Sequence, residues 1–78
     1  MSTTTENARA MSDLEYDLIT VLKNKSEAVK AYDTYIQDAQ SMDSQPCVEL
    51  FRKLKENEMQ TAQEVRSHLQ QVMQNGKM

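Results

Sequence analysis

Three side chains of this sequence are of types that carry out chemistry in proteins: Glu58, Cys47 and His68. Glu58 falls on the apolar stripe of a long predicted helix, where a carboxylate is costly unless a partner compensates its charge. Cys47, the one cysteine, falls in the first turn of that helix, where the helix dipole favours the nucleophilic thiolate. We treat Cys47 as a candidate reactive thiol, the alternative being a small residue buried beneath a loop. His68 follows Glu64 by four residues, but two ligands fall short of the three or four of a zinc site.

The composition narrows the class of protein. One Gly and one Pro in 78 residues remove most β-turn chemistry and favour long helices. The net charge is −3, and Lys and Arg are scattered among Asp and Glu, whereas nucleic-acid binding needs a concentrated basic face. No apolar run reaches the ~18 residues of a membrane span, and the first ten residues lack the apolar segment of a signal peptide. We therefore expect a cytoplasmic protein that binds neither nucleic acid nor membrane.

The first part of the chain predicts a tail followed by a helix. Residues 1–10 are mostly polar and without period, so we expect residues 1–11 to form a flexible tail. Ser12 and Glu15 have the spacing of a capping box, so a helix over about residues 13–40 should begin there. Apolar residues then recur at spacings of three, four and seven, at Leu14, Leu18, Leu22, Val29, Tyr32, Ile36 and Ala39.

A loop over residues 41–45 separates this helix from a second one over about residues 46–75. Asp43 or Ser44 is placed to cap the second helix, and Pro46 is tolerated in a first turn. The apolar stripe of this helix holds Val48, Phe51, Leu54, Ala62, Val65, Leu69 and Val72, with Glu58 among them. Gly76 can take the left-handed conformation that ends a helix, which leaves residues 76–78 as the C-terminal end.

Two helices of about 42–45 Å with a short connection predict an all-α antiparallel hairpin. Each stripe is wider than one partner helix covers, because Ile19, Val21, Leu50 and Met73 flank the main positions. A lone hairpin of this size buries too little surface to offset its chain entropy. We therefore expect a homodimer in which two hairpins form a four-helix bundle.

A polar layer is expected across the middle of the hairpin. Lys25 and Ser26 interrupt the first stripe, and Glu58 and Thr61 lie at the same level on the second helix. In the preferred interpretation, Glu58 pairs with Lys25, or accepts a hydrogen bond from a tyrosine or from a second copy. The layer would then fix register at a cost in stability. Alternatively, Glu58 leans into solvent, or Glu27 and Glu58, doubled by dimer symmetry, form a carboxylate metal site.

The metal hypothesis comes from a resemblance. The stretches SEAVKAYDTYIQDAQ and ELFRKLKENEMQTAQEVRSHL resemble the paired half-repeat of rubrerythrin and other ferritin-like proteins. The stretch LEYDLITVLKNKSEAVKAYDTYIQDAQ is also similar to short bacterial helical-hairpin proteins of unknown function. The ferritin-like resemblance implies that Glu58, and Glu27 from the first helix, would hold iron. The family's histidine falls on Thr61, which cannot replace an imidazole ligand. The resemblance therefore supports a ferritin-like bundle and argues against its chemistry.

The expected function is that of a small structural or protein-interaction module without catalysis or cofactor. It would act as a homodimer and bind an unidentified protein partner through its helix faces. Two alternatives remain open at this point. One is a carboxylate iron-binding protein that uses Glu27 and Glu58, and the other is a redox-responsive regulator that uses Cys47.

Overall fold

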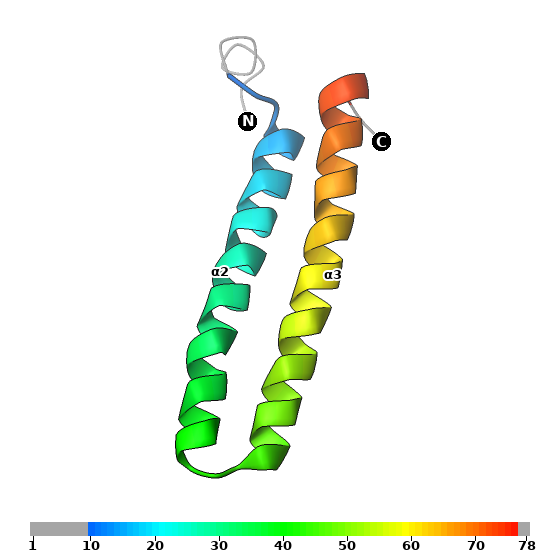
Figure 1. Ribbon diagram of the computed structural model, residues 1–78. Coiled ribbons are helices and arrows are strands. Elements are labelled where there is room, and N and C mark those ends of the chain that lie inside the picture. The colour runs from blue at the N-terminus through cyan, green and yellow to red at the C-terminus, as the bar shows by residue number, and fades with distance from the viewer. Residues whose placement is uncertain (1–9, 77–78) are drawn as a thin grey trace.

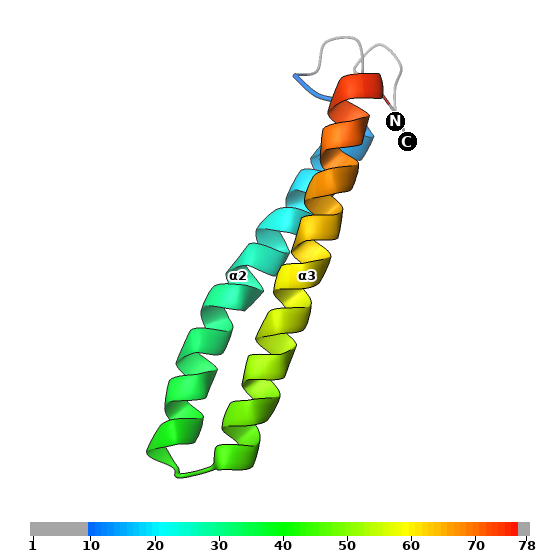
Figure 2. The same cartoon turned by 45° about the vertical axis from the view of Figure 1, so that its right-hand side comes forward.

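The computed structural model describes residues 10–76, which form two long helices joined by residues 42–44 (Figure 1). Helix α2 spans Asp13–Ser41 and helix α3 spans Gln45–Asn75, each within one residue of the predicted bounds. Two views show the helices antiparallel and side by side, with the turn at one end (Figures 1 and 2). No strand occurs among residues 10–76. The predicted all-α hairpin is confirmed for this part of the chain, whereas most of the predicted tail lies outside the described residues.

Both outer ends of the hairpin are stabilised as the sequence predicts. The Ser12 hydroxyl accepts a hydrogen bond from the Glu15 backbone N–H at 3.2 Å, and the Glu15 carboxylate accepts one from the Ser12 N–H at 2.8 Å. At the end of α3, Gly76 has a φ of 77° and its N–H donates to the Val72 carbonyl at 2.7 Å. The capping box and the left-handed glycine are therefore both confirmed.

The turn differs from the expectation that Asp43 or Ser44 caps α3 through its side chain. Ser44 is the N-cap residue, but its side chain makes no capping hydrogen bond. One of the two N–H groups that an N-cap side chain normally bonds belongs here to Pro46, which has none. Asp43 takes a φ of 54°, and backbone bonds close the turn: Asp43 N–H to the Gln40 carbonyl at 3.1 Å and Ser44 N–H to the Ala39 carbonyl at 2.9 Å. These bonds satisfy carbonyls at the end of α2, so backbone geometry makes this turn without a side-chain cap.

The helices pack along a contact line that we call the seam. On α2 the seam consists of Leu18, Leu22, Lys25, Val29, Tyr32, Ile36 and Ala39; on α3 it consists of Val48, Phe51, Lys55, Glu58, Ala62, Val65, Leu69 and Val72. The spacing alternates between three and four residues, which is the heptad pattern of a helix pair. Among residues 10–76, only Ala39, Val48 and Val72 are buried, and the other seam residues are half-buried. The seam therefore holds the two helices together without forming an enclosed core.

Aromatic rings pack most closely near the turn. Tyr32 and Tyr35 meet edge to face with ring centroids 5.6 Å apart. Phe51 on α3 lies 5.7 Å from the Tyr35 ring and 6.4 Å from the Tyr32 ring. Such contacts contribute about 0.5–1.5 kcal/mol beyond the area that the rings bury. This ring cluster and the buried Ala39 and Val48 lie in the turn half of the hairpin.

The hairpin is elongated, with principal extents of 56 × 20 × 14 Å. Its accessible surface is 6003 Å². A compact monomer of 9.0 kDa would expose about 4,900 Å². The chain thus keeps a large share of its side-chain surface in contact with solvent. Among residues 10–76, no helix has an apolar stretch long enough to cross a membrane.

Candidate functional site

The middle of the seam holds an ion pair between Lys25 of α2 and Glu58 of α3. The Lys25 Nζ lies 3.3 Å from the Glu58 Oε1, and the side chains are 24% and 26% exposed. The ammonium group compensates a carboxylate that would otherwise be costly on an apolar stripe. The pairing of Glu58 with Lys25 expected from the sequence is therefore present, and Glu58 does not lean freely into solvent.

The polar layer is narrower than the sequence suggests. Ser26 is exposed, because a residue next to a seam residue points about 100° away from it around the helix. The Thr61 hydroxyl donates to carbonyls of its own helix, at 3.0 Å to Asn57 and 3.2 Å to Glu58. Ser26 thus lies outside the seam, and Thr61 contributes no hydrogen bond across it. Of the four residues expected in the polar layer, only Lys25 and Glu58 form a polar contact between the helices.

Glu27 and Glu58 are not brought together within one chain. Glu27 is exposed on the outer surface of α2, where its carboxylate lies 3.6 Å from the ammonium of Lys23. Glu58 is paired across the seam with Lys25. Within residues 10–76, no group of three or more His, Cys, Asp or Glu side chains could hold a metal ion. The residues of a single hairpin do not fit the iron site that the ferritin-like resemblance implies.

Cys47 lies in the first turn of α3 with its thiol free and exposed. The next residue, Val48, is one of the three buried side chains, and Cys47 points away from that packed position. The alternative of a small side chain buried beneath the loop is therefore wrong. The thiol is accessible to reagents.

His68 makes a local bond with its own helix. Its Nδ1 lies 2.8 Å from the backbone carbonyl oxygen of Glu64, so the protonated ring nitrogen donates to that oxygen. Both side chains are exposed. Cys47, Glu58 and His68 lie near the turn, in the middle and towards the open end of the hairpin, respectively, and they do not converge on one site.

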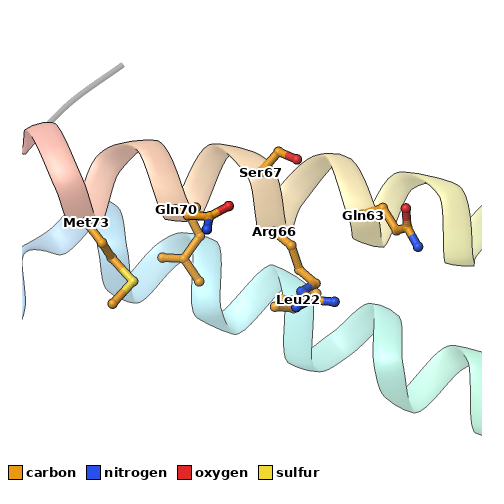
Figure 3. A pocket seen from close by; sticks show the side chains of 7 residues that line it. Leu22, Gln63, Arg66, Ser67, Gln70 and Met73 are labelled. Carbon is orange, nitrogen blue, oxygen red and sulfur yellow. The ribbon is translucent and has the colours of Figure 1, made fainter.

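A shallow groove of about 400 Å³ lies between the helices towards the open end (Figure 3). In this view Arg66 extends from α3 towards Leu22 of α2, whereas Ser67 points away from α2. The groove is lined by Leu22, Gln63, Arg66, Ser67, Leu69, Gln70 and Met73. It has the volume of a small-molecule site but holds one charged side chain and no converging set of polar groups. The sequence analysis did not identify this groove.

The two sides of the seam differ in chemistry. The apolar flank consists of Leu14, Val21, Ala28 and Tyr35, which recur every seven residues on α2, together with Leu50 and Leu54 on α3. In an antiparallel pair of right-handed helices, these residues lie on the same side, together with Cys47, Thr61 and His68. The mixed flank is on the other side and consists of Ile19, Ser26, Asp33, Arg52, Met59, Arg66 and Met73.

The apolar flank is largely uncovered. Leu14, Val21, Tyr35 and Leu50 are 43%, 42%, 44% and 50% exposed, respectively. The sequence analysis noted Val21 and Leu50 as flanking residues and did not identify the flank as one surface. The available signal was the recurrence of apolar residues at every seventh position from Leu14 to Met42. This surface is the strongest candidate for a functional site in the described part of the chain.

Comparisons of the chain with protein-family models, curated proteins and solved structures find no match. The likeness to rubrerythrin half-repeats and to short bacterial hairpin proteins therefore stays a prediction from sequence. The function is therefore inferred from the structure of the hairpin alone.

Proposed function

We propose that the protein is a non-catalytic structural or interaction module that acts as a homodimer, its two hairpins forming a four-helix bundle. One observation carries this proposal: apolar side chains outside the seam recur at every seventh position along α2, and most of the larger ones on this flank are exposed. Contiguous exposed apolar surface of this kind is typical of an interaction site. We further propose that the module works in the cytoplasm, where a single unpaired thiol stays reduced.

The limited burial within one hairpin supports a dimer. A chain of 78 residues is near the size at which one hydrophobic core is only marginally stabilising. Here the described core has three buried residues, all of them small: Ala39, Val48 and Val72. A standard interface buries about 800 Å² on each partner. Removing that much surface would bring the exposed area of each chain close to that of a compact protein.

The separation of the reactive side chains supports a role without catalysis. Acid–base and nucleophilic catalysis need a reactive group within hydrogen-bond reach of an activating group. Within residues 10–76, the side-chain partner of Glu58 is the ammonium of Lys25, and His68 bonds a backbone carbonyl. We assign the Lys25–Glu58 pair to register instead, because an apolar seam alone would tolerate sliding of one helix along the other.

Sedimentation equilibrium of the full chain over a wide range of concentrations tests the dimer. We expect a species with twice the chain mass of 9.0 kDa, which dissociates on dilution, and a melting temperature that rises with chain concentration. A folded species of 9.0 kDa at every concentration, with a concentration-independent melting temperature, would contradict the proposal.

A further inference from the structure

We infer that a second copy of this chain covers the apolar flank, so that the flank residues of α2 lie at the centre of the dimer and the mixed flank stays in solvent. This inference rests on the proposed homodimer and adds which surface forms it.

The flank runs along the whole of α2. Leu14, Val21, Ala28 and Tyr35 occupy every seventh position, and Met42 continues the series at the end of the helix. A simple two-helix pair needs apolar residues only in its seam, whereas a third apolar heptad position is the pattern of a helix in a bundle. An occupant must therefore be a helix about as long as α2. A second copy supplies such a helix with the same stripe.

Charge is segregated around the flank. Within residues 10–76, each Lys and Arg lies in the seam, on the mixed flank or on the outer faces, at Lys23, Lys25, Lys30, Arg52, Lys53, Lys55 and Arg66. The charged residues that border the apolar flank are the carboxylates Asp17, Asp38 and Glu64. Depletion of charge is typical of the buried centre of an interface. Two copies joined through this flank bring only carboxylates near each other at its edge, so salt should strengthen the dimer by screening their repulsion.

Two residues of the flank favour close packing of a second helix: a tyrosine whose ring is already held in place, and an alanine near the middle. Tyr35 is held against Tyr32 and Phe51 by ring contacts at 5.6 and 5.7 Å, so it loses little side-chain freedom when a partner covers it. Ala28, near the midpoint of α2, is the smallest residue of the flank. A small side chain at that point lets a second helix approach closely while the larger side chains on either side interlock.

Paired lysine substitutions on the two flanks test the assignment. The apolar-flank variant carries Val21→Lys and Tyr35→Lys, and the matched control carries Ile19→Lys and Met59→Lys on the mixed flank. The replaced side chains have similar exposure, 42% and 44% against 38% and 44%, and both variants add the same charge. By sedimentation equilibrium we expect the apolar-flank variant to weaken the dimer by about 100-fold or more and the control to weaken it by less than about 3-fold.

Tyr35 belongs to the ring cluster, so replacing it could unfold the hairpin. A second variant therefore separates loss of the dimer from loss of the fold. Leu14→Lys with Val21→Lys leaves the rings intact and should also weaken the dimer by about 100-fold while helical circular dichroism at high concentration is retained. For the wild-type chain, raising NaCl from about 0.01 M to about 0.15 M shortens the Debye length from ~30 Å to ~8 Å and should tighten the dimer.

The outcomes separate the inference from the proposed function. A wild-type chain that is always monomeric contradicts the homodimer itself. A wild-type dimer that survives both apolar-flank variants but is lost in the Ile19/Met59 control keeps the homodimer and overturns the assignment of its surface. A wild-type dimer that salt weakens also overturns the assignment, because ion pairs would then join the copies. A monomeric chain that binds a synthetic lysine-rich amphipathic helix would assign the flank to a basic partner and overturn the inference.

Discussion

The turn half of the hairpin and its middle are held together by different interactions. Near the turn, Tyr32, Tyr35 and Phe51 pack their rings together beside the buried Ala39 and Val48. In the middle, a half-buried ion pair replaces apolar contact. Ring packing adds stability in proportion to buried area, whereas a partly buried ion pair roughly balances Coulomb attraction against lost solvation. The turn half should therefore supply stability, and the middle should supply the choice of register.

The largest effect should follow from removing the ring that α3 contributes to the cluster. Phe51→Ala deletes a ring that contacts both tyrosines, and we expect a loss of about 3 kcal/mol in the free energy of unfolding. Urea denaturation followed by circular dichroism, at one fixed chain concentration, measures this loss. Met73→Ala, which removes a large side chain that is 63% exposed, is the matched control and should change stability by less than about 0.5 kcal/mol. Equal losses in the two variants would show that stability is not concentrated near the turn.

The middle should respond to single and double substitutions in opposite ways. Glu58→Leu leaves Lys25 without its partner in the seam, and because both side chains stay about a quarter exposed, we expect a loss of only about 1 kcal/mol. Lys25→Leu combined with Glu58→Leu removes both charges and should restore or exceed wild-type stability. Urea midpoints of the four chains complete a double-mutant cycle. A double variant clearly less stable than wild type would make the pair a net source of stability, and a double loss equal to the sum of the single losses would show that the two side chains are not coupled.

A second ion pair serves as a reference for the first. Lys55 lies 2.7 Å from Asp33, closer than Lys25 lies to Glu58, but the Asp33 side chain is mostly exposed. Solvent screens such a pair, so its contribution is typically below about 1 kcal/mol despite the shorter distance. Asp33→Asn should therefore change the urea midpoint less than Glu58→Leu does. The burial of both partners, more than the distance between their charged atoms, decides how strongly the hairpin depends on an ion pair.

The sequence predicts correctly those features whose interacting residues are close together in the chain. It also predicts an interaction for which a residue has few possible partners. The capping box joins residues three positions apart, and Gly76 ends α3 through its own backbone freedom, so local chemistry determines both. Glu58 had few partners that could compensate its charge, which made Lys25 predictable. Ser26 and Thr61 were harder, because the direction of a side chain changes by about 100° with each residue around the helix. Hydrophobic periodicity also carries no information on the positive φ of Asp43.

The same substitution should have different effects at the N-termini of the two helices. Both begin with a serine at the N-cap, but only the Ser12 hydroxyl accepts a capping hydrogen bond. Ser12→Ala should therefore cost about 1 kcal/mol, whereas Ser44→Ala should cost close to nothing because no side-chain bond is lost. Urea midpoints of the two variants at one chain concentration make the comparison, and helical circular dichroism of Ser12→Ala should also fall as the first turn of α2 frays. A loss at Ser44 equal to that at Ser12 would mean that the Ser44 hydroxyl caps α3 after all. The turn would then depend on a side-chain bond as well as on the backbone bonds from Asp43 and Ser44.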